Sequence, residues 1–159
     1  MKQIAIDLDG VLGDTRPLWN DWLDDAARRY RSIAPLEPTD LPRDRGEAAR
    51  VLDEWATQGV GDWRSALGRF AEDRAPVYLR PDAEVSAALR ELAARGHTIG
   101  AFTDAPEPLA RIALSQLGAE RRLAELETGE GALPRLLEKL GPDALVVRER
   151  SELPLQFDP

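Results

Sequence analysis

Short apolar runs alternate with amphipathic helical patterns along most of this chain, and this alternation constrains the fold most strongly. The first run, Gln3 to Ile6, carries β-branched and small apolar residues without a helical period, so it predicts a buried strand. From Val77 onward the pattern predicts strands at 98–102, 123–126 and 144–147, separated by helices between 82 and 96, between 106 and 118, and over 133–140. Such alternation is typical of an α/β fold with a parallel sheet covered by helices on both faces.

A helical stretch interrupts this pattern after the first strand. Apolar residues recur at helical spacing from Trp19 to Tyr30, a proline-containing loop follows at 32–45, and further helices are expected over 47–58 and after Asp62. All four tryptophans fall in this stretch, which indicates a small core of its own; a substrate pocket lined by one or two of them is the alternative. We therefore expect an α/β core from residues 1–15 and 77–159, and a helical cap from residues 16–76 over the carboxyl ends of the strands.

Composition narrows the classes of function. With 29 acidic and 21 basic residues among 159, the net charge is −8, which argues against a nucleic acid polymer as partner. Cysteine is absent, which excludes thiolate metal sites and cysteine nucleophiles, and the single His97 cannot form a multi-histidine site. No stretch resembles a signal peptide or a membrane span, so we expect a cytoplasmic protein without membrane contact, as a monomer or a homodimer.

Two carboxylates follow the first strand, in the sequence Asp7-Leu8-Asp9-Gly10-Val11. Residues two apart in a strand point to the same side, so Asp7 and Asp9 are expected to share one small volume at the sheet edge. Crowded acids repel each other, which favours a bound cation or a shared proton there. The alternative is a surface loop in which the carboxylates cap backbone amides and Gly10 supplies a positive φ.

The same residues resemble the first motif, D-x-D-G-[TV], of the haloacid-dehalogenase-like (HAD) superfamily. The later strand ending in Thr103-Asp104-Ala105 resembles the approach to its second motif, and Leu117-Gly118 and the helix with Pro134 follow in the family's order. The chain is most similar to members with a helical cap after the first motif. The resemblance implies a Rossmann-like α/β core with a parallel sheet.

The resemblance also implies roles for individual residues. Asp7 would be the nucleophile that forms an aspartyl-phosphate, and Asp9 would protonate the leaving group and then activate water. Gly10, Thr103 and Asp104 would belong to the phosphate site, the helix after Asp104 adding its positive end. Mg²⁺ would be held by the Asp7 side chain, the Asp9 backbone carbonyl and an acid of the last motif. Because dehalogenases generally lack a second acid, Asp9 favours phosphoryl transfer.

The second half departs from the family pattern. Gly131 stands where the third motif supplies a lysine, and Lys2 and Lys139 are the only lysines, so Arg135 is the candidate substitute. The last motif reads Arg148-Glu149-Arg150-Ser151-Glu152, in which Glu149 would be the metal ligand, unless this is a plain surface charge run.

The expected function is Mg²⁺-dependent hydrolysis of a small phosphorylated metabolite. The alternative is a catalytically degenerate HAD-like protein that binds a phosphorylated ligand or a protein partner.

Overall fold

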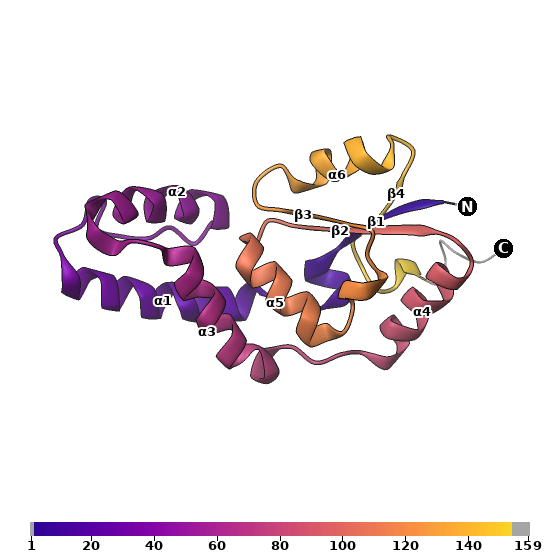
Figure 1. Cartoon of the computed structure of the whole chain (residues 1–159), viewed down its shortest axis with the longest axis horizontal. Coiled ribbons are helices and arrows are strands. Elements are labelled where there is room, and N and C mark those ends of the chain that lie inside the picture. The colour runs from indigo at the N-terminus through magenta and orange to yellow at the C-terminus, as the bar shows by residue number, and fades with distance from the viewer. Residues whose placement is uncertain (1, 154–159) are drawn as a thin grey trace.

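A four-stranded parallel sheet lies at the centre of the structure, a computed structural model that describes residues 2–153 (Figure 1). The strands are β1 (Gln3–Asp7), β2 (Thr98–Thr103), β3 (Glu125–Thr128) and β4 (Leu145–Val147), in the order β3-β2-β1-β4. Ile6 pairs with Ala101 on one side and with Val147 on the other, so β1, β2 and β4 end at one edge. The predicted parallel α/β sheet is confirmed.

Helices cover both faces of this sheet (Figure 1). On one face lies α6 (Ala132–Leu140), whose Leu136 and Leu140 pack with Ala5 and Phe102. On the other lie α4 (Ala83–Ala94) and α5 (Glu107–Leu117), which share a larger cluster with Ile4 and Ile6. A Cβ at Gly100 would lie 2.7 Å from Leu136 Cδ1, so glycine at this position permits the close approach of α6.

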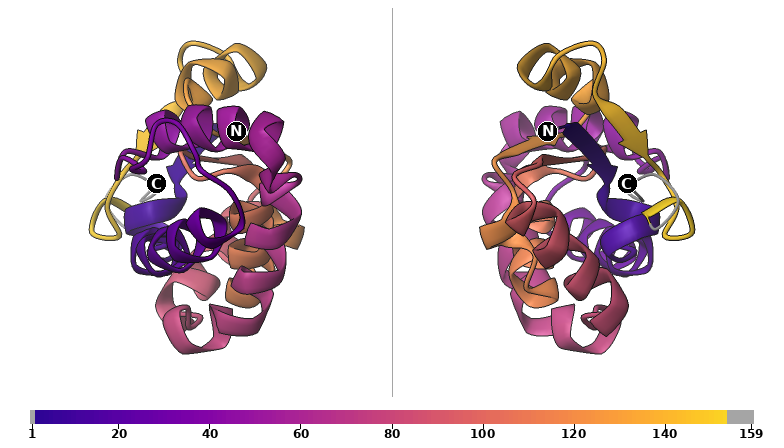
Figure 2. Two further views of the ribbon diagram at one scale, coloured as in Figure 1. Left: turned by 90° about the vertical axis from the view of Figure 1, so that its left-hand side faces the viewer. Right: turned by 90° about the vertical axis from the view of Figure 1, so that its right-hand side faces the viewer.

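Three helices between β1 and α4 form a second body of packed side chains, which faces the viewer in the left panel of Figure 2. They are α1 (Arg16–Ile33), α2 (Arg45–Trp55) and α3 (Trp63–Tyr78). We call residues 16–78 the helical segment. All four tryptophans are buried in it, and the Trp22 ring lies 5.5 Å from that of Trp19 and 5.8 Å from that of Trp63. Ala105 and Leu109 belong to the same cluster, so the helical segment packs directly on the sheet-bearing part. The division of the chain into an α/β core (1–15 and 77–159) and a cap (16–76) stays a prediction.

Most helix ends follow local sequence signals. Asp44, Asp62 and Asp82 each accept a backbone N–H in the first turn of α2, α3 and α4 respectively. Gly118 ends α5 in the left-handed conformation, with φ of 69°.

Three boundaries differ from those expected. Helix α2 begins at Arg45 and gives way to a wide turn, η2 (Ala56–Val60), where Gly59 has a φ of 117°. Helix α3 continues through Pro76 to Tyr78. Strand β3 begins at Glu125 because the short helix η3 (Glu120–Arg122) occupies the residues before it.

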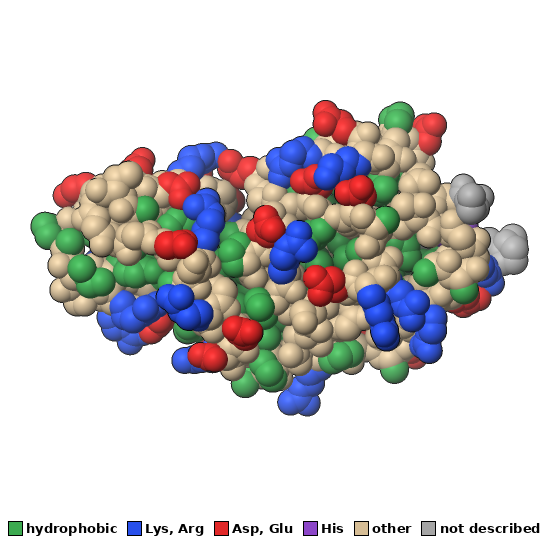
Figure 3. Space-filling view, viewed as in Figure 1, with side chains coloured by type: hydrophobic (Ala, Val, Ile, Leu, Met, Phe, Trp, Pro, Cys, Tyr) green, Lys and Arg blue, Asp and Glu red, His purple; other side chains and the backbone are tan. Residues whose placement is uncertain are grey.

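Charged side chains of both signs are interspersed over the face shown in Figure 3, and no extended area of one sign is visible there. Within residues 2–153, no helix has the length and apolar character that crossing a bilayer requires.

Candidate functional site

The acid pair and the threonine predicted to act with it line one cavity at the carboxyl edge of the sheet. Asp7 is the last residue of β1, Asp9 lies in the wide turn η1 (Leu8–Leu12), and Thr103 ends β2. The Thr103 hydroxyl donates to Asp9 Oδ2 over 2.8 Å. The cavity measures about 360 Å³. Its other lining residues are Arg16, Arg45, Phe102, Asp104, Gly129, Gly131, Ala132, Leu133, Pro134 and Arg148.

Asp9 is surrounded by hydrogen-bond donors. Its Oδ1 accepts the backbone N–H and the hydroxyl of Thr15, each over 2.7 Å. Its Oδ2 accepts the Thr103 hydroxyl and also Arg45 Nη2, at 2.6 Å. Because the Asp9 side chain is only 7 % exposed, these protein donors replace the water that would otherwise solvate it.

Arg45 connects the helical segment to the acid pair. It is the first residue of α2, its side chain is 6 % exposed, and its Nη2 lies 2.6 Å from Asp9 Oδ2 and 2.6 Å from Asp104 Oδ1. Its Nη1 donates to the Thr15 hydroxyl at 2.6 Å. One buried guanidinium thus bonds to residues that follow β1 and β2. The sequence analysis placed Arg45 in a loop and gave it no role; the Asp44 cap was the one local signal for a helix starting there.

Asp7 is a partly buried carboxyl group with a raised pKa. Burial, followed by the negative charge of Asp9, raises its pKa from 3.8 to about 6, and the nearby Arg148 partly opposes the rise. Arg148 Nη1 lies 3.8 Å from Asp7 Oδ2. Its guanidinium carbon also lies 5.5 Å from the centre of the Phe102 ring, within the range of a cation–π contact.

Arg135, the candidate substitute for the missing lysine, is not among the residues that line this cavity. It donates to Glu127 Oε2 at 3.1 Å and to the backbone carbonyls of Thr128 and Glu130. Lys139 also bonds to Glu127, at 2.7 Å. The bonds from Lys139 and Arg135 hold the pKa of Glu127 below its ordinary value. Both cations therefore stabilise the end of β3 and the loop that follows it.

Gly10 serves the backbone turn and does not line the cavity. Its φ is 125°, and its N–H donates to the Gly13 carbonyl at 2.9 Å, so this amide is already used within the turn. A Cβ here would lie 2.6 Å from the Arg148 carbonyl oxygen. Glycine is required by both the positive φ and this close approach of the chain after β4.

The residues present do not fit a resident Mg²⁺ ion. Glu149, the predicted third carboxylate, is exposed in the turn after β4 and is absent from the cavity lining. In the part of the chain from 2 to 153, no three His, Cys, Asp or Glu side chains are placed so that they could hold one metal ion. Both side-chain oxygens of Asp9 are occupied by donors, which leaves its backbone carbonyl, the predicted ligand, as its one contribution, and Arg148 faces Asp7. Mg²⁺ takes six oxygen ligands, several of which are usually waters, but the predicted protein ligands Asp7, Asp9 and Glu149 are not assembled, because Glu149 lies outside the cavity lining.

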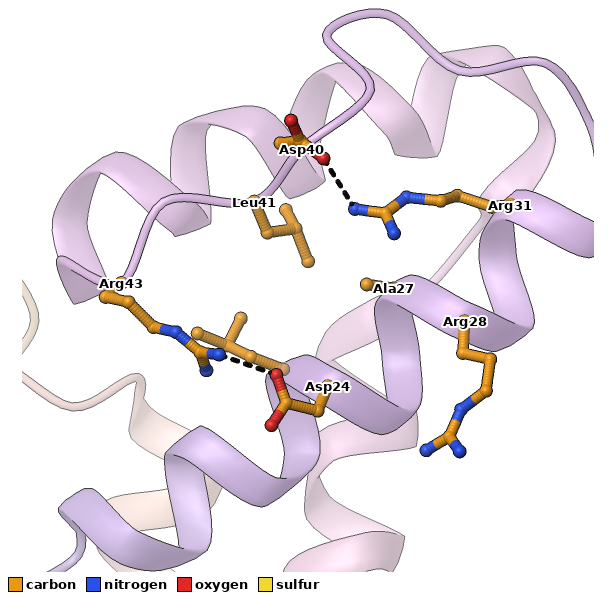
Figure 4. A pocket seen from close by; sticks show the side chains of 8 residues that line it. Asp24, Ala27, Arg28, Arg31, Asp40, Leu41 and Arg43 are labelled. Carbon is orange, nitrogen blue, oxygen red and sulfur yellow. Dashed lines mark hydrogen bonds and ion pairs between the residues drawn. The ribbon is translucent and has the colours of Figure 1, made fainter.

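A larger cavity, of about 810 Å³, lies between α1 and the loop before α2 (Figure 4). Two of the arginines that line it are paired across it, Arg31 with Asp40 at 3.1 Å and Arg43 with Asp24 at 2.7 Å. It contains neither the strand ends nor the acid pair. We therefore place the candidate site at the smaller cavity, where the reactive groups converge.

Comparison with known proteins identifies the family to which the chain belongs. Residues 1–146 match the family of haloacid dehalogenase-like hydrolases, so the chain belongs to that family. No curated protein matches the sequence. Among solved structures, a Thermotoga maritima protein assigned as a beta-phosphoglucomutase superposes with a TM-score of 0.56 at 18% identity, covering 92% of this chain and 75% of that one. A Haemophilus somnus 129PT protein predicted to be a phosphoglycolate phosphatase gives 0.51 at 16% identity, covering 89% of this chain and 72% of that one. These two likenesses show a shared fold.

Proposed function

We propose that the chain hydrolyses a small phosphorylated metabolite through an aspartyl-phosphate on Asp7. One observation carries this proposal: Asp7, Asp9 and Thr103 line a single cavity at the carboxyl edge of a HAD-like sheet. A cavity of about 360 Å³ suits a small molecule. The solved structures with the same fold include proteins assigned to phosphate-ester chemistry, which supports the same class of substrate here.

In the proposed reaction, an Asp7 carboxylate oxygen attacks phosphorus and the bond from phosphorus to the leaving oxygen breaks. The leaving oxygen takes a proton from Asp9. Water then attacks the phosphorus of the aspartyl-phosphate and gives a proton to Asp9, while the bond to the Asp7 oxygen breaks and inorganic phosphate leaves. The Thr103 hydroxyl, which donates to Asp9 Oδ2 in the structure, would donate to a phosphoryl oxygen once that bond is released.

Arg45 sets a condition on this reaction. In the structure its guanidinium lies 2.6 Å from Asp9 Oδ2, the oxygen that also bonds Thr103. A proton can be carried and delivered by Asp9 only if one of its four donor contacts is released. An anionic phosphoryl group in the cavity competes with Asp9 for Arg45, because guanidinium binds phosphate in a bidentate geometry. We therefore propose that the Arg45 side chain, at the start of α2 in the helical segment, releases Asp9 when a phosphoryl group binds, and that this segment acts as a cap on the site.

Hydrolysis of an aryl phosphate by wild type and by Asp7→Asn tests the proposal. Loss of the nucleophile should reduce the rate on the order of 10³-fold or more. Asp21→Asn, which removes an exposed carboxylate on α1, is the matched control and should leave the rate unchanged. Mass spectrometry of acid-quenched wild type should show phosphorylation at Asp7.

The alternative is a binding protein without turnover. Two observations support it: both side-chain oxygens of Asp9 are already bonded to protein donors, and Gly131 stands in place of the motif lysine. This alternative would be established if wild type and Asp7→Asn both hydrolysed the aryl phosphate only at the background rate while the protein bound inorganic phosphate.

A further inference from the structure

The strand register places a cation beside the proposed nucleophile. Ile6 of β1 pairs with Val147, the last residue of β4. The next residue in the sequence is Asp7 after Ile6 and Arg148 after Val147, so these two lie side by side. The Arg148 backbone N–H bonds to Glu152 Oε2 at 3.2 Å. Its side chain lies beside the Phe102 ring and is 58 % exposed. The backbone around Arg148 is thus fixed, and its guanidinium remains open to a ligand in the cavity.

We propose that Arg148 supplies, at Asp7, the positive charge that a divalent cation would otherwise supply, so that this site binds phosphoryl groups without a metal. The inference rests on the proposed function for its ligand class and goes beyond it in naming the charge that holds the ligand. A guanidinium presents a planar fork of N–H donors that matches two phosphoryl oxygens, and its charge persists throughout the working pH range.

The charges around the cavity support the same inference. Three arginines, Arg16, Arg45 and Arg148, and three aspartates, Asp7, Asp9 and Asp104, line it. Two of the aspartates are already bonded to Arg45, at 2.6 Å each. A divalent cation beside Asp7 would meet the like charge of Arg148 and would find the other two carboxylates already bonded to Arg45. Arg16 is likewise paired with Asp14, at 2.8 Å, whereas the Arg148 side chain is 58 % exposed. A phosphate dianion would therefore meet the donors of Arg148 first.

Binding of inorganic phosphate to EDTA-treated protein is the first test, measured by isothermal titration calorimetry. We expect binding by wild type without added metal, weakened at least tenfold in Arg148→Ala and less in Arg148→Lys. Arg121→Ala removes the same charge from an exposed site in η3 and should bind like wild type. Because Arg148 is exposed, its variants should fold normally, which the thermal unfolding midpoint verifies. Phosphate binding that needs Mg²⁺, or that Arg148→Ala leaves unchanged, would overturn the inference.

Turnover of an aryl phosphate is the second test and separates this inference from the proposed function. We expect equal rates in EDTA and in Mg²⁺ for wild type, and a rate lower by about 10²-fold or more in Arg148→Ala. Arg148→Asp, which places a carboxylate instead of a cation beside Asp7, should become dependent on Mg²⁺. Turnover that EDTA abolishes in wild type overturns the inference and leaves the hydrolase proposal standing. Metal-free phosphate binding through Arg148 without any turnover overturns the hydrolase proposal alone.

Discussion

At the scale of single residues, the raised pKa of Asp7 makes stability depend on pH. Its pKa is about 6 in the folded protein, against an ordinary value of 3.8. The folded state therefore binds the Asp7 proton more tightly than the unfolded state does. This contribution to stability is fully present below about pH 4 and is lost as pH rises through about 6. Above that pH, the ionised Asp7 costs roughly 1–3 kcal/mol, since 1 pKa unit corresponds to about 1.4 kcal/mol and solvent screens part of it.

Asp7→Asn should therefore stabilise the protein at neutral and alkaline pH while it removes activity. The neutral amide avoids the cost of burying a charge beside Asp9, and we expect a Tm about 3–8 °C above wild type near pH 8. Near pH 4 the two should unfold at similar temperatures, because Asp7 is then largely protonated. Calorimetric melts of both proteins at the two pH values measure the difference, with Asp21→Asn as the control. A lower Tm for Asp7→Asn near pH 8 would contradict this account.

The sequence predicted the site residues that belong to local motifs, but not those brought to the site from distant parts of the sequence. Asp7 and Asp9 follow one predicted strand and Thr103 closes another, so the parallel topology alone places them at one edge. Arg45 reaches Asp9 across 36 positions of sequence, and no local pattern reports such a contact. Glu149 was expected to be a metal ligand, but the residue that directly follows β4 and faces Asp7 is Arg148. An alignment to a motif cannot tell which of two adjacent residues points into a cavity.

At the scale of elements, the start of α2 determines where Arg45 lies. Asp44 accepts the Glu47 N–H at 3.0 Å and fixes the first turn of the helix whose first residue is Arg45. The helix was predicted from its apolar spacing, and its start was misplaced because the preceding proline-containing stretch suggested a loop. Strand and helix types were predictable from periodicity, and several helix ends from local capping residues, whereas the structure shifted other ends by a few residues.

Asp44→Ala should destabilise the protein by about 0.5–2 kcal/mol through loss of this cap. It should also reduce kcat more than a cap removed elsewhere, because the turn that holds Arg45 frays. Asp62→Ala, which removes the cap of α3, is the matched control and should cost similar stability with little effect on kcat. Urea unfolding and aryl phosphate kinetics on both variants test this, and equal kinetic effects would show that the position of Arg45 does not depend on the cap.

At the scale of the whole molecule, the helical segment and the sheet-bearing part share side chains. Leu109 and Ala105 belong to the tryptophan cluster, and Tyr78 and Ile112 pack against both large clusters. The ion pair between Arg50 and Glu130, at 2.6 Å, adds a contact between α2 and the loop before α6. Because the two bodies are packed together in this way, we expect them to unfold together.

Tryptophan fluorescence and circular dichroism should accordingly give one coincident unfolding transition. All four tryptophans lie in the helical segment and report on it alone, whereas the dichroism signal comes from helices of both parts. Leu109→Ala, at a fully buried contact between them, should lower both midpoints together and cost about 2–5 kcal/mol. Two separated transitions in wild type would show that the parts fold independently.

The position of Arg45 between Asp9 and Asp104 has a consequence for selectivity. A neutral ligand has no charge with which to replace the two carboxylates bonded to this guanidinium. The bonds from Arg45 to Asp9 and Asp104 would therefore persist in its presence. An anion can displace them, and the same displacement would uncover the acid needed for reaction. The protein would then distinguish anionic from uncharged compounds by whether they can replace the carboxylates at Arg45, whatever the shape of the rest of the compound.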